Sequence, residues 1–125
     1  MAESLLNIKN LKTYYFTESG VVKAVDDVTL DMRRGELLGL VGESGSGKST
    51  LGLSIIRLIP PPGKIIDGSV FLDNTDLMRI SEKELRKIRG RRIGMIFQDP
   101  LTCLDPLRRI EDQMVETVMV HMDVE

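Results

Sequence analysis

The sequence predicts an α/β fold in which an antiparallel β layer accompanies a parallel core sheet covered by helices. Residues 5–16 predict one strand and residues 21–32 predict one or two more, because both segments have the alternating apolar positions expected of strands with one exposed face. Residues 36–42 (ELLGLVG) are apolar without alternation, which is typical of a strand buried on both faces. A glycine-rich bend follows this run, and residues 48–59 then predict a helix that the prolines after it end.

The elements that follow are predicted from local signals. Residues 68–74 (GSVFLDN) predict a short strand that leads into a turn. A polar helix is expected over 81–90, with Ser81 as N-cap, Glu84 in a capping box and Gly90 at its end. These signals place a strand and a helix between the glycine-rich bend and the second half of the chain.

The second half begins with another apolar run. Residues 92–97 (RIGMIF) predict a second buried strand, and residues 98–106 predict a loop with two prolines. Over 107–123 apolar residues recur at spacings of three and four, which predicts an amphipathic helix. Its apolar positions are Leu107, Ile110, Met114, Val118 and Met122.

Composition narrows the class of protein. The chain has 125 residues and a formal net charge of −2, so it lacks the overall basic charge expected of a nucleic-acid-binding domain. Its single cysteine, Cys103, cannot form an internal disulfide, which suits a reducing compartment such as the cytosol. No apolar run approaches the roughly 18 residues of a membrane span, and the N-terminus lacks the pattern of a secretory signal. We therefore expect an intracellular protein that reaches a membrane only through a partner.

The glycine-rich bend carries the clearest chemical signal. Gly42, Gly47, Lys48 and Ser49 fit the phosphate-loop pattern G-x-x-x-x-G-K-[ST], between a predicted strand and a predicted helix. Glycines let the backbone approach a ligand closely, and successive N–H groups can form a nest for an anion. The helix that follows adds its positive N-terminal dipole. The sequence therefore predicts a nucleotide-binding site.

Individual roles follow from the residue types. Lys48 is placed to neutralise the β- and γ-phosphates, the Ser49 hydroxyl to bind Mg²⁺, and Thr50 to contact the α-phosphate. The predicted nucleotide-binding residues of the loop are Gly42, Glu43, Ser44, Gly45, Ser46, Gly47, Lys48, Ser49 and Thr50. A phosphate loop alone does not separate ATPases, GTPases and small kinases, although no N-K-x-D motif of guanine-specific GTPases occurs in the sequence.

Two stretches together point to one family. The chain carries VGESGSGKST at 41–50 and IGMIFQDP at 93–100. In this combination it resembles the ATP-binding subunits of ABC transporters, and more narrowly the importers of oligopeptides, dipeptides and nickel. The resemblance extends from about Leu5 to Ile110. It implies a phosphate-loop NTPase fold, of which this chain would be the N-terminal part, with an incomplete parallel sheet.

The resemblance also implies roles for residues outside the loop. Gln98 matches the family's glutamine loop, so it would contact Mg²⁺ and position the attacking water, and Lys48 would assist by neutralising phosphate charge. An aromatic residue near the end of the first strand stacks on adenine in this family. Tyr15 is our choice for that residue, with Tyr14 and Phe16 as alternatives.

Some residues invite other interpretations. The importer branch usually has serine and asparagine where this chain has Cys103 and Asp105, which bears on coupling to the transporter and not on ATP binding. Cys103 has no base beside it to make it a nucleophile. His121 is expected on the helix surface, and the basic run at 86–92 is expected to be a solvated helix end.

Several family motifs are not in the sequence. The LSGGQ signature, the strand ending in Asp-Glu and the switch histidine follow the glutamine loop in ABC ATPases, and none occurs here. We therefore expect negligible ATP hydrolysis from the 125 residues alone, and exposed apolar surface on 36–42 because its parallel neighbours come later in the chain. The expected domains are 1–98, the partial nucleotide-binding core, and 99–125, the start of the helical subdomain.

The sequence thus predicts the ATP-binding component of an ABC importer for peptides or similar solutes, with ATP and Mg²⁺ as cofactors. Its implied partners are a second ATP-binding subunit in a head-to-tail dimer, transmembrane permease subunits and, indirectly, a solute-binding protein. Nucleic acid is not expected. The implied location is the cytoplasmic face of the cell membrane. Two alternatives are a different phosphate-loop enzyme, such as a small-molecule kinase, and a nucleotide-binding fragment that does not hydrolyse ATP.

Overall fold

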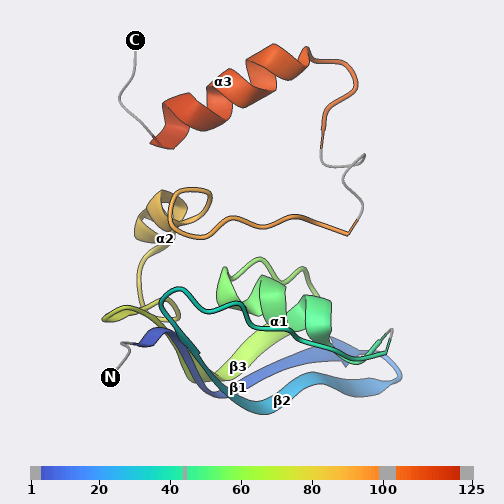
Figure 1. Ribbon diagram of the computed structural model, residues 1–125. Coiled ribbons are helices and arrows are strands. Elements are labelled where there is room, and N and C mark those ends of the chain that lie inside the picture. The colour runs from blue at the N-terminus through green and yellow to red at the C-terminus, as the bar shows by residue number, and fades with distance from the viewer. Residues whose placement is uncertain (1–3, 44, 99–103, 122–125) are drawn as a thin grey trace. The chain divides into compact units, whose positions relative to one another are not determined.

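The computed structural model describes residues 4–43, 45–98 and 104–121. The chain divides into two compact units, 1–80 and 81–125. The first contains four strands and the helix α1, and the second contains the helices α2 and α3 (Figure 1). The predicted domain boundary after residue 98 stays a prediction.

The first unit is built on one antiparallel sheet with the strand order β2-β1-β3-β4. The two alternating segments form β1 (Ser4–Thr17) and β2 (Gly20–Arg33), which confirms them as strands of an antiparallel layer. β3 (Gly63–Leu72) begins before the predicted 68–74, and after a turn the chain forms the short β4 (Thr75–Asp76).

A bulge in β1 places two apolar residues on the same face although they are three positions apart. Ile8 pairs with Leu30 and Leu11 with Val28, so β1 carries one extra residue between these pairs. Asn10 supplies it with a φ of +50°, and its side-chain amide donates to Asp27 Oδ1 at 2.8 Å. Both Ile8 and Leu11 are therefore fully buried. Simple alternation along the sequence does not reveal this bulge.

α1 (Lys48–Ile55) lies along one face of the sheet (Figure 1). Leu51 is buried, and the buried hydroxyls of Ser54 and Thr13 are 2.7 Å apart. Because Ser54 Oγ donates to Thr50 O at 2.7 Å, the Thr13 hydroxyl is the donor between the two side chains. The core of this unit consists of Ile8, Leu11, Val25, Leu51, Ile56, Val70, Leu72 and Leu77.

α1 ends earlier than the sequence predicts. The expected helix ran to residue 59, but the chain leaves helical geometry after Ile55, and Arg57 has a φ of +56°. The Arg57 guanidinium then donates to the carbonyl oxygens of Leu77 at 3.3 Å and Ile80 at 2.7 Å. These tertiary contacts hold a conformation that a helical pattern cannot anticipate.

The two predicted buried strands do not form, and these predictions are wrong for the described residues. Residues 36–42 are without strand pairing, and the side chains of Leu37 and Val41 are 98% and 97% exposed, which confirms the exposed apolar surface expected on this segment. In 92–97 the only pairing is an isolated bridge between Ile93 and Arg89. The physical reason is the same for both: a strand buried on two faces needs a neighbouring strand, and none of the described residues supplies one.

In the second unit, α2 (Glu82–Ile88) begins at the predicted cap. The Ser81 hydroxyl accepts the backbone N–H of Glu84 at 3.2 Å. Just beyond the helix Gly90 has a φ of +81°, which confirms its predicted place at the helix end. In the basic run, Arg89 forms an ion pair with Glu82 at 2.7 Å, and most other basic side chains are exposed.

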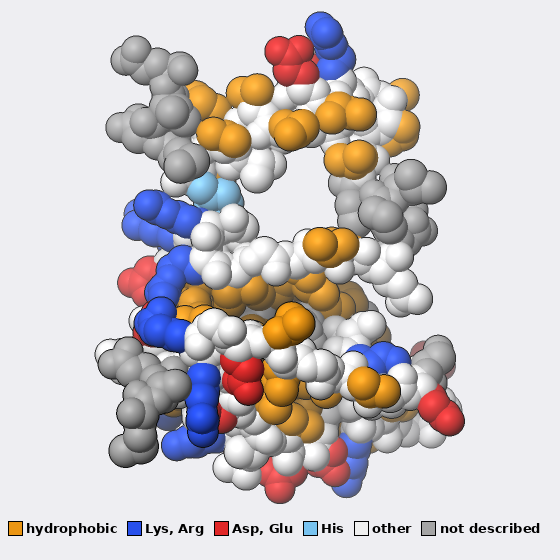
Figure 2. Space-filling model, viewed as in Figure 1, with side chains coloured by type: hydrophobic (Ala, Val, Ile, Leu, Met, Phe, Trp, Pro, Cys, Tyr) orange, Lys and Arg blue, Asp and Glu red, His pale blue; other side chains and the backbone are white. Residues whose placement is uncertain are grey.

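α3 (Ile110–His121) begins three residues later than predicted and has no fully buried side chain. Its apolar side chains lie along its surface (Figure 2). They are Ile110, Met114, Val115, Val118, Met119 and Val120, and Leu107 precedes them. Met122, predicted to end the stripe, lies outside the described residues. Across 4–43, 45–98 and 104–121, no helix has the length and apolarity that crossing a membrane would require.

Candidate functional site

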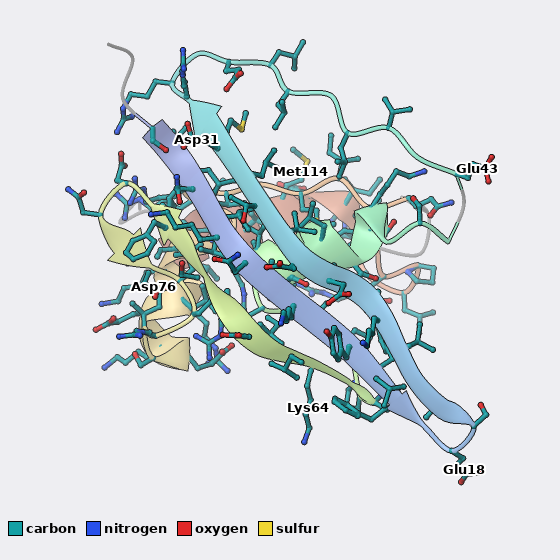
Figure 3. All side chains as sticks on the ribbon, turned by 90° about the horizontal axis from the view of Figure 1, so that it is seen from below. Glu18, Asp31, Glu43, Lys64, Asp76 and Met114 are labelled. Carbon is teal, nitrogen blue, oxygen red and sulfur yellow. The ribbon has the colours of Figure 1, made fainter. Side chains whose placement is uncertain are left out.

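The phosphate loop joins the extended segment 36–43 to the N-terminus of α1. Glu43 lies at the outer side of this connection, away from the sheet (Figure 3). A short turn follows, in which the Ser46 N–H donates to the Glu43 carbonyl oxygen at 3.1 Å. Ser44 lies outside the described residues. The other eight predicted residues of the loop are brought together in one compact bend.

Gly47 is the residue through which the loop packs against the sheet. It precedes α1 with a φ of +99°, a conformation that favours glycine. A Cβ at this position would also collide with the backbone carbonyl oxygen of Ala24 in β2. Gly45 has a φ of +84°, but a Cβ there would meet no atom within 4 Å. Gly47 therefore has two independent requirements for glycine, and the contact with Ala24 was not predicted from the sequence.

Lys48 lies back across the mouth of the loop. Its ammonium group donates to the carbonyl oxygen of Gly42 and, at 3.4 Å, to that of Glu43. An ammonium group has three donors, so these two contacts leave one for a phosphate oxygen. A Cβ on Gly42 would be 2.5 Å from Ser46 Oγ, so the missing side chain gives the two ends of the bend room to approach. The loop thus holds its cation in place without a ligand.

The N-terminus of α1 presents its backbone N–H groups without competition from side chains. No side chain caps this end, and the first turn contains no acidic residue. The Leu51 N–H is satisfied by Gly47 O at 2.9 Å, whereas the three residues before it carry the N–H groups that a helix leaves unpaired. These residues are Lys48, Ser49 and Thr50, and the Ser49 side chain is exposed. Such an end favours an anion.

Tyr15 lies on β1 beside this loop. It pairs with Val22 of β2, two residues from Ala24, against which Gly47 packs. Its side chain is half-buried, and on its other side it pairs with Gly63 of β3. The structure therefore places Tyr15 in the part of the sheet that carries the phosphate loop.

The alternative Tyr14 is engaged elsewhere. Neighbouring residues of a strand face opposite sides of the sheet, so Tyr14 faces away from buried Thr13 and from α1. Its hydroxyl donates to Asp26 Oδ1 at 2.6 Å, and this hydrogen bond is the main reason why the pKa of Tyr14 is raised. The Lys23 ammonium lies 5.6 Å from its ring centre. Phe16, the second alternative, shares the Tyr14 face by the same alternation.

Gln98 belongs to the other compact unit and is exposed at a bend that follows the segment 94–97. Its predicted contact with Mg²⁺ and water stays a prediction. Cys103 lies outside the described residues, whereas Asp105 accepts the backbone N–H of Leu107 at 2.9 Å. His121 is half-buried on α3, which has no fully buried side chain, and a Cβ on Gly90 would be 2.6 Å from its Nε2.

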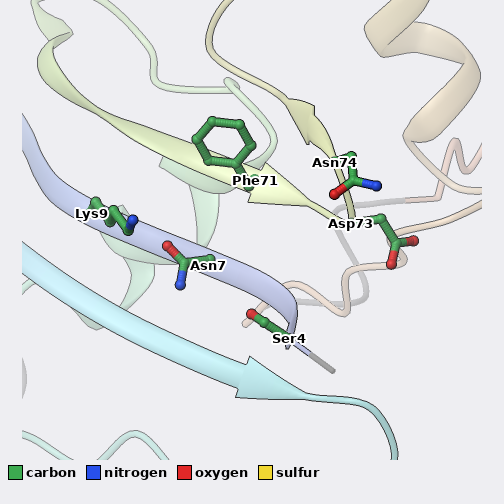
Figure 4. A pocket seen from close by; sticks show the side chains of 6 residues that line it. All are labelled: Ser4, Asn7, Lys9, Phe71, Asp73 and Asn74. Carbon is green, nitrogen blue, oxygen red and sulfur yellow. The ribbon is translucent and has the colours of Figure 1, made fainter. Parts of the chain in front are cut away.

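A pocket lies at the end of the sheet away from the phosphate loop. It has a volume of about 490 Å³ and contains no residue of the phosphate loop (Figure 4). Its lining residues are Ser4, Asn7, Lys9, Phe71, Asp73 and Asn74. Asn7 and Ser4 both donate to Asp31, and these bonds lower the pKa of its carboxyl group. These contacts hold the ends of β1 and β2 together, which is a structural role.

The sequence profile of the family described as ABC transporter matches residues 25–125. The chain belongs to the ABC transporter family. This family assignment also confirms the predicted fold class of the chain, because the cassette structures below share its fold.

Relatives of this ABC transporter family member have peptide-transport names. The dipeptide transport ATP-binding protein DppD of Bacillus subtilis is 45% identical over 95% of this chain and 36% of its own length. The oligopeptide transport ATP-binding protein OppD of Escherichia coli is 42% identical over 98% of this chain and 36% of its own length. The chain thus spans a little over a third of these relatives.

Solved structures agree with this assignment. The dimeric structure of MJ0796, a bacterial ABC transporter cassette, matches with a TM-score of 0.82 and 29% identity, over 96% of this chain and 49% of the cassette. A post-hydrolysis structure of the same cassette, bound to ADP and Pi, matches with a TM-score of 0.67 and 27% identity. It covers 91% of this chain and 54% of the cassette.

Proposed function

We propose that this chain is part of the ATP-binding component of an ABC importer for peptides or similar solutes. The observation that carries the proposal is the seated phosphate loop: Gly47 against Ala24, Lys48 across the loop mouth and an uncapped helix N-terminus. These features provide a cation and several backbone N–H donors at one place, which suits a polyphosphate. The peptide-transport names of the relatives favour the solute class.

In this proposal ATP binds with its phosphates in the loop and its base near Tyr15. The third donor of the Lys48 ammonium contacts the β- and γ-phosphates, and the Ser49 hydroxyl contacts Mg²⁺. No cluster of three or more metal-ligating side chains occurs among the described residues. This fits a magnesium ion that arrives with the nucleotide, because Mg²⁺ is commonly held by substrate phosphates and few protein ligands. Bound Mg²⁺ would neutralise phosphate charge.

The proposed partners follow from the same assignment. A second ATP-binding subunit would complete the site in a head-to-tail dimer, and the dimeric cassette of similar fold supports this arrangement. Transmembrane permease subunits would hold the protein at the cytoplasmic face of the membrane, and a solute-binding protein would deliver cargo to them. Gln98 would position water for hydrolysis of ATP by the whole subunit. A kinase would additionally need a site for a phosphate acceptor.

The proposal is tested first at Lys48. We expect Lys48→Ala to weaken binding of MgATP at least about 10-fold, because the neutralising cation is lost from the loop. Fluorescent nucleotide displacement or calorimetry on the intact protein measures this. The matched control is Lys64→Ala, which removes an exposed lysine from β3 (Figure 3) and should leave affinity unchanged. Equal effects of both variants, or none at Lys48, would contradict the proposal.

A further inference from the structure

Tyr15 and Gly63 form a cross-strand pair in which the glycine leaves room for the aromatic ring. The two residues lie opposite each other in the β1–β3 register. A Cβ on Gly63 would be 2.7 Å from Cε1 of Tyr15, 2.5 Å from Cγ2 of Ile59 and 3.0 Å from the carbonyl oxygen of Pro60. Directly opposite side chains in an antiparallel pair normally share this space. Here the ring of Tyr15 occupies it.

We propose that Gly63 is a positioning residue that sets the ring of Tyr15 for contact with the base of the nucleotide. This inference rests on the proposed function, in which Tyr15 stacks on that base. Gly63 is not among the residues with a positive φ, so the backbone alone does not require glycine here. Its requirement is space, and the atoms that take up the space belong to the side chains of Tyr15 and Ile59 and to the Pro60 backbone.

The backbone around Gly63 is held from two sides. The Gly63 N–H donates to Pro60 O at 2.9 Å, and the Phe16 N–H donates to Pro62 O at 3.1 Å. These bonds tie the 60–63 segment to itself and to β1. A methyl group added at Gly63 would therefore be accommodated by rotation of the two side chains more readily than by retreat of the backbone. Because the Tyr15 ring turns about two bonds, it would leave its present position.

The position of that ring matters because of what lies next to it. Tyr15 pairs with Val22 of β2. Ala24, against which Gly47 packs, lies two residues further along the same strand. A separation of two residues along a strand is about 6.6–6.8 Å. The ring and the phosphate loop are thus linked through one short piece of β2. A displaced ring would reduce base contacts and leave the phosphate contacts of the loop intact.

The test compares a ligand with a base and one without. In the intact protein, we expect Gly63→Ala to weaken MgATP binding about 10-fold and to leave binding of magnesium tripolyphosphate unchanged. Tyr15→Ala should give the same selective loss. The double variant should lose no more than Tyr15→Ala alone, because Gly63 acts through that ring. Lys64→Ala is the control, since it changes the exposed neighbour of Gly63 on β3, and it should change the affinity for neither ligand.

The outcomes separate the two proposals. If Tyr15→Ala leaves the ratio of ATP to tripolyphosphate affinity unchanged, the stacking role of Tyr15 in the proposed function is wrong. If Tyr15→Ala changes this ratio and Gly63→Ala does not, only the positioning role is wrong. Equal weakening of both ligands by Gly63→Ala, or failure of this variant to fold, would also overturn the positioning role. Either result would mean that alanine at position 63 disturbs the backbone and does not act through the Tyr15 ring.

Discussion

The β1–β2 hairpin and the segment 36–42 are both rich in apolar residues, yet they behave differently. In the hairpin, the Leu11 side chain is completely buried, and its strand β1 is paired on both sides, with β2 and β3. In the segment, Leu37 is 98% exposed and its backbone pairs with no described strand. β1 meets β2 across the short turn at 18–19, so the partner is adjacent in sequence. A strand of a parallel sheet needs partners that arrive from far along a chain.

The difference teaches that an apolar pattern specifies burial but does not supply a partner. Alternation in β1 and β2 needs only one covered face, and the hairpin itself provides the hydrogen bonds. The continuous apolar run at 36–42 needs pairing along both edges and cover on both faces. The phosphate loop connects these two regions. The unpaired segment precedes it, and Gly47 at its other end packs against β2.

The largest expected effect contrasts the same substitution in the two regions. Leu11→Ala should lower the free energy of unfolding by about 2–5 kcal/mol, because it leaves a cavity in the core. Leu37→Ala should change it by less than about 0.5 kcal/mol, because the side chain is exposed. Urea unfolding followed by circular dichroism measures both. A comparable loss from Leu37→Ala would show that this segment is packed in solution and would break the comparison.

A smaller effect is expected where the loop meets the sheet. Gly47→Ala should cost about 1–3 kcal/mol, because alanine would occupy a left-handed conformation and its Cβ would collide with Ala24 O. It should also weaken nucleotide binding. Thermal unfolding and nucleotide titration measure the two effects, and Gly39→Ala in the unpaired segment serves as the neutral control. A stable Gly47→Ala variant with unchanged affinity would mean that Gly47 is not seated on β2.

The smallest effect concerns the hydroxyl pair that fixes α1 to the sheet. Thr13→Val should cost about 1 kcal/mol, because it removes the hydrogen bond to Ser54 at 2.7 Å. The cost stays modest because Ser54 Oγ keeps its bond to the Thr50 carbonyl oxygen. Thr17→Val, at the exposed end of β1, is the comparison: its hydroxyl donates to Gly20 O at 2.6 Å, and losing this exposed hydrogen bond should cost less than losing the buried one. If the two variants have the same denaturant midpoint, the buried contact between Thr13 and Ser54 does not stabilise the packing of α1 on the sheet.

Local chemistry made part of the structure predictable. Ser81 caps α2 because its hydroxyl lies three residues before a backbone N–H, and the helix end at Gly90 was equally visible. The phosphate-loop residues are predicted as a group because their spacing is fixed within one bend, and their contacts with a nucleotide stay a prediction. Tyr15 could be proposed as the base-contacting residue only through the family resemblance. The support that Gly63 gives it comes from a strand nearly fifty residues later, which no local pattern contains.

By itself, the sequence determined the two strands of the hairpin, the cap and the end of α2, and the family to which the chain belongs. These properties depend on neighbours within a few residues or on the identity of the residues themselves. Only the tertiary structure decided the bulge at Asn10, the early end of α1 and the seating of Gly47 on Ala24. Such features depend on which distant backbone comes close, and a pattern along one segment carries no information about its partner.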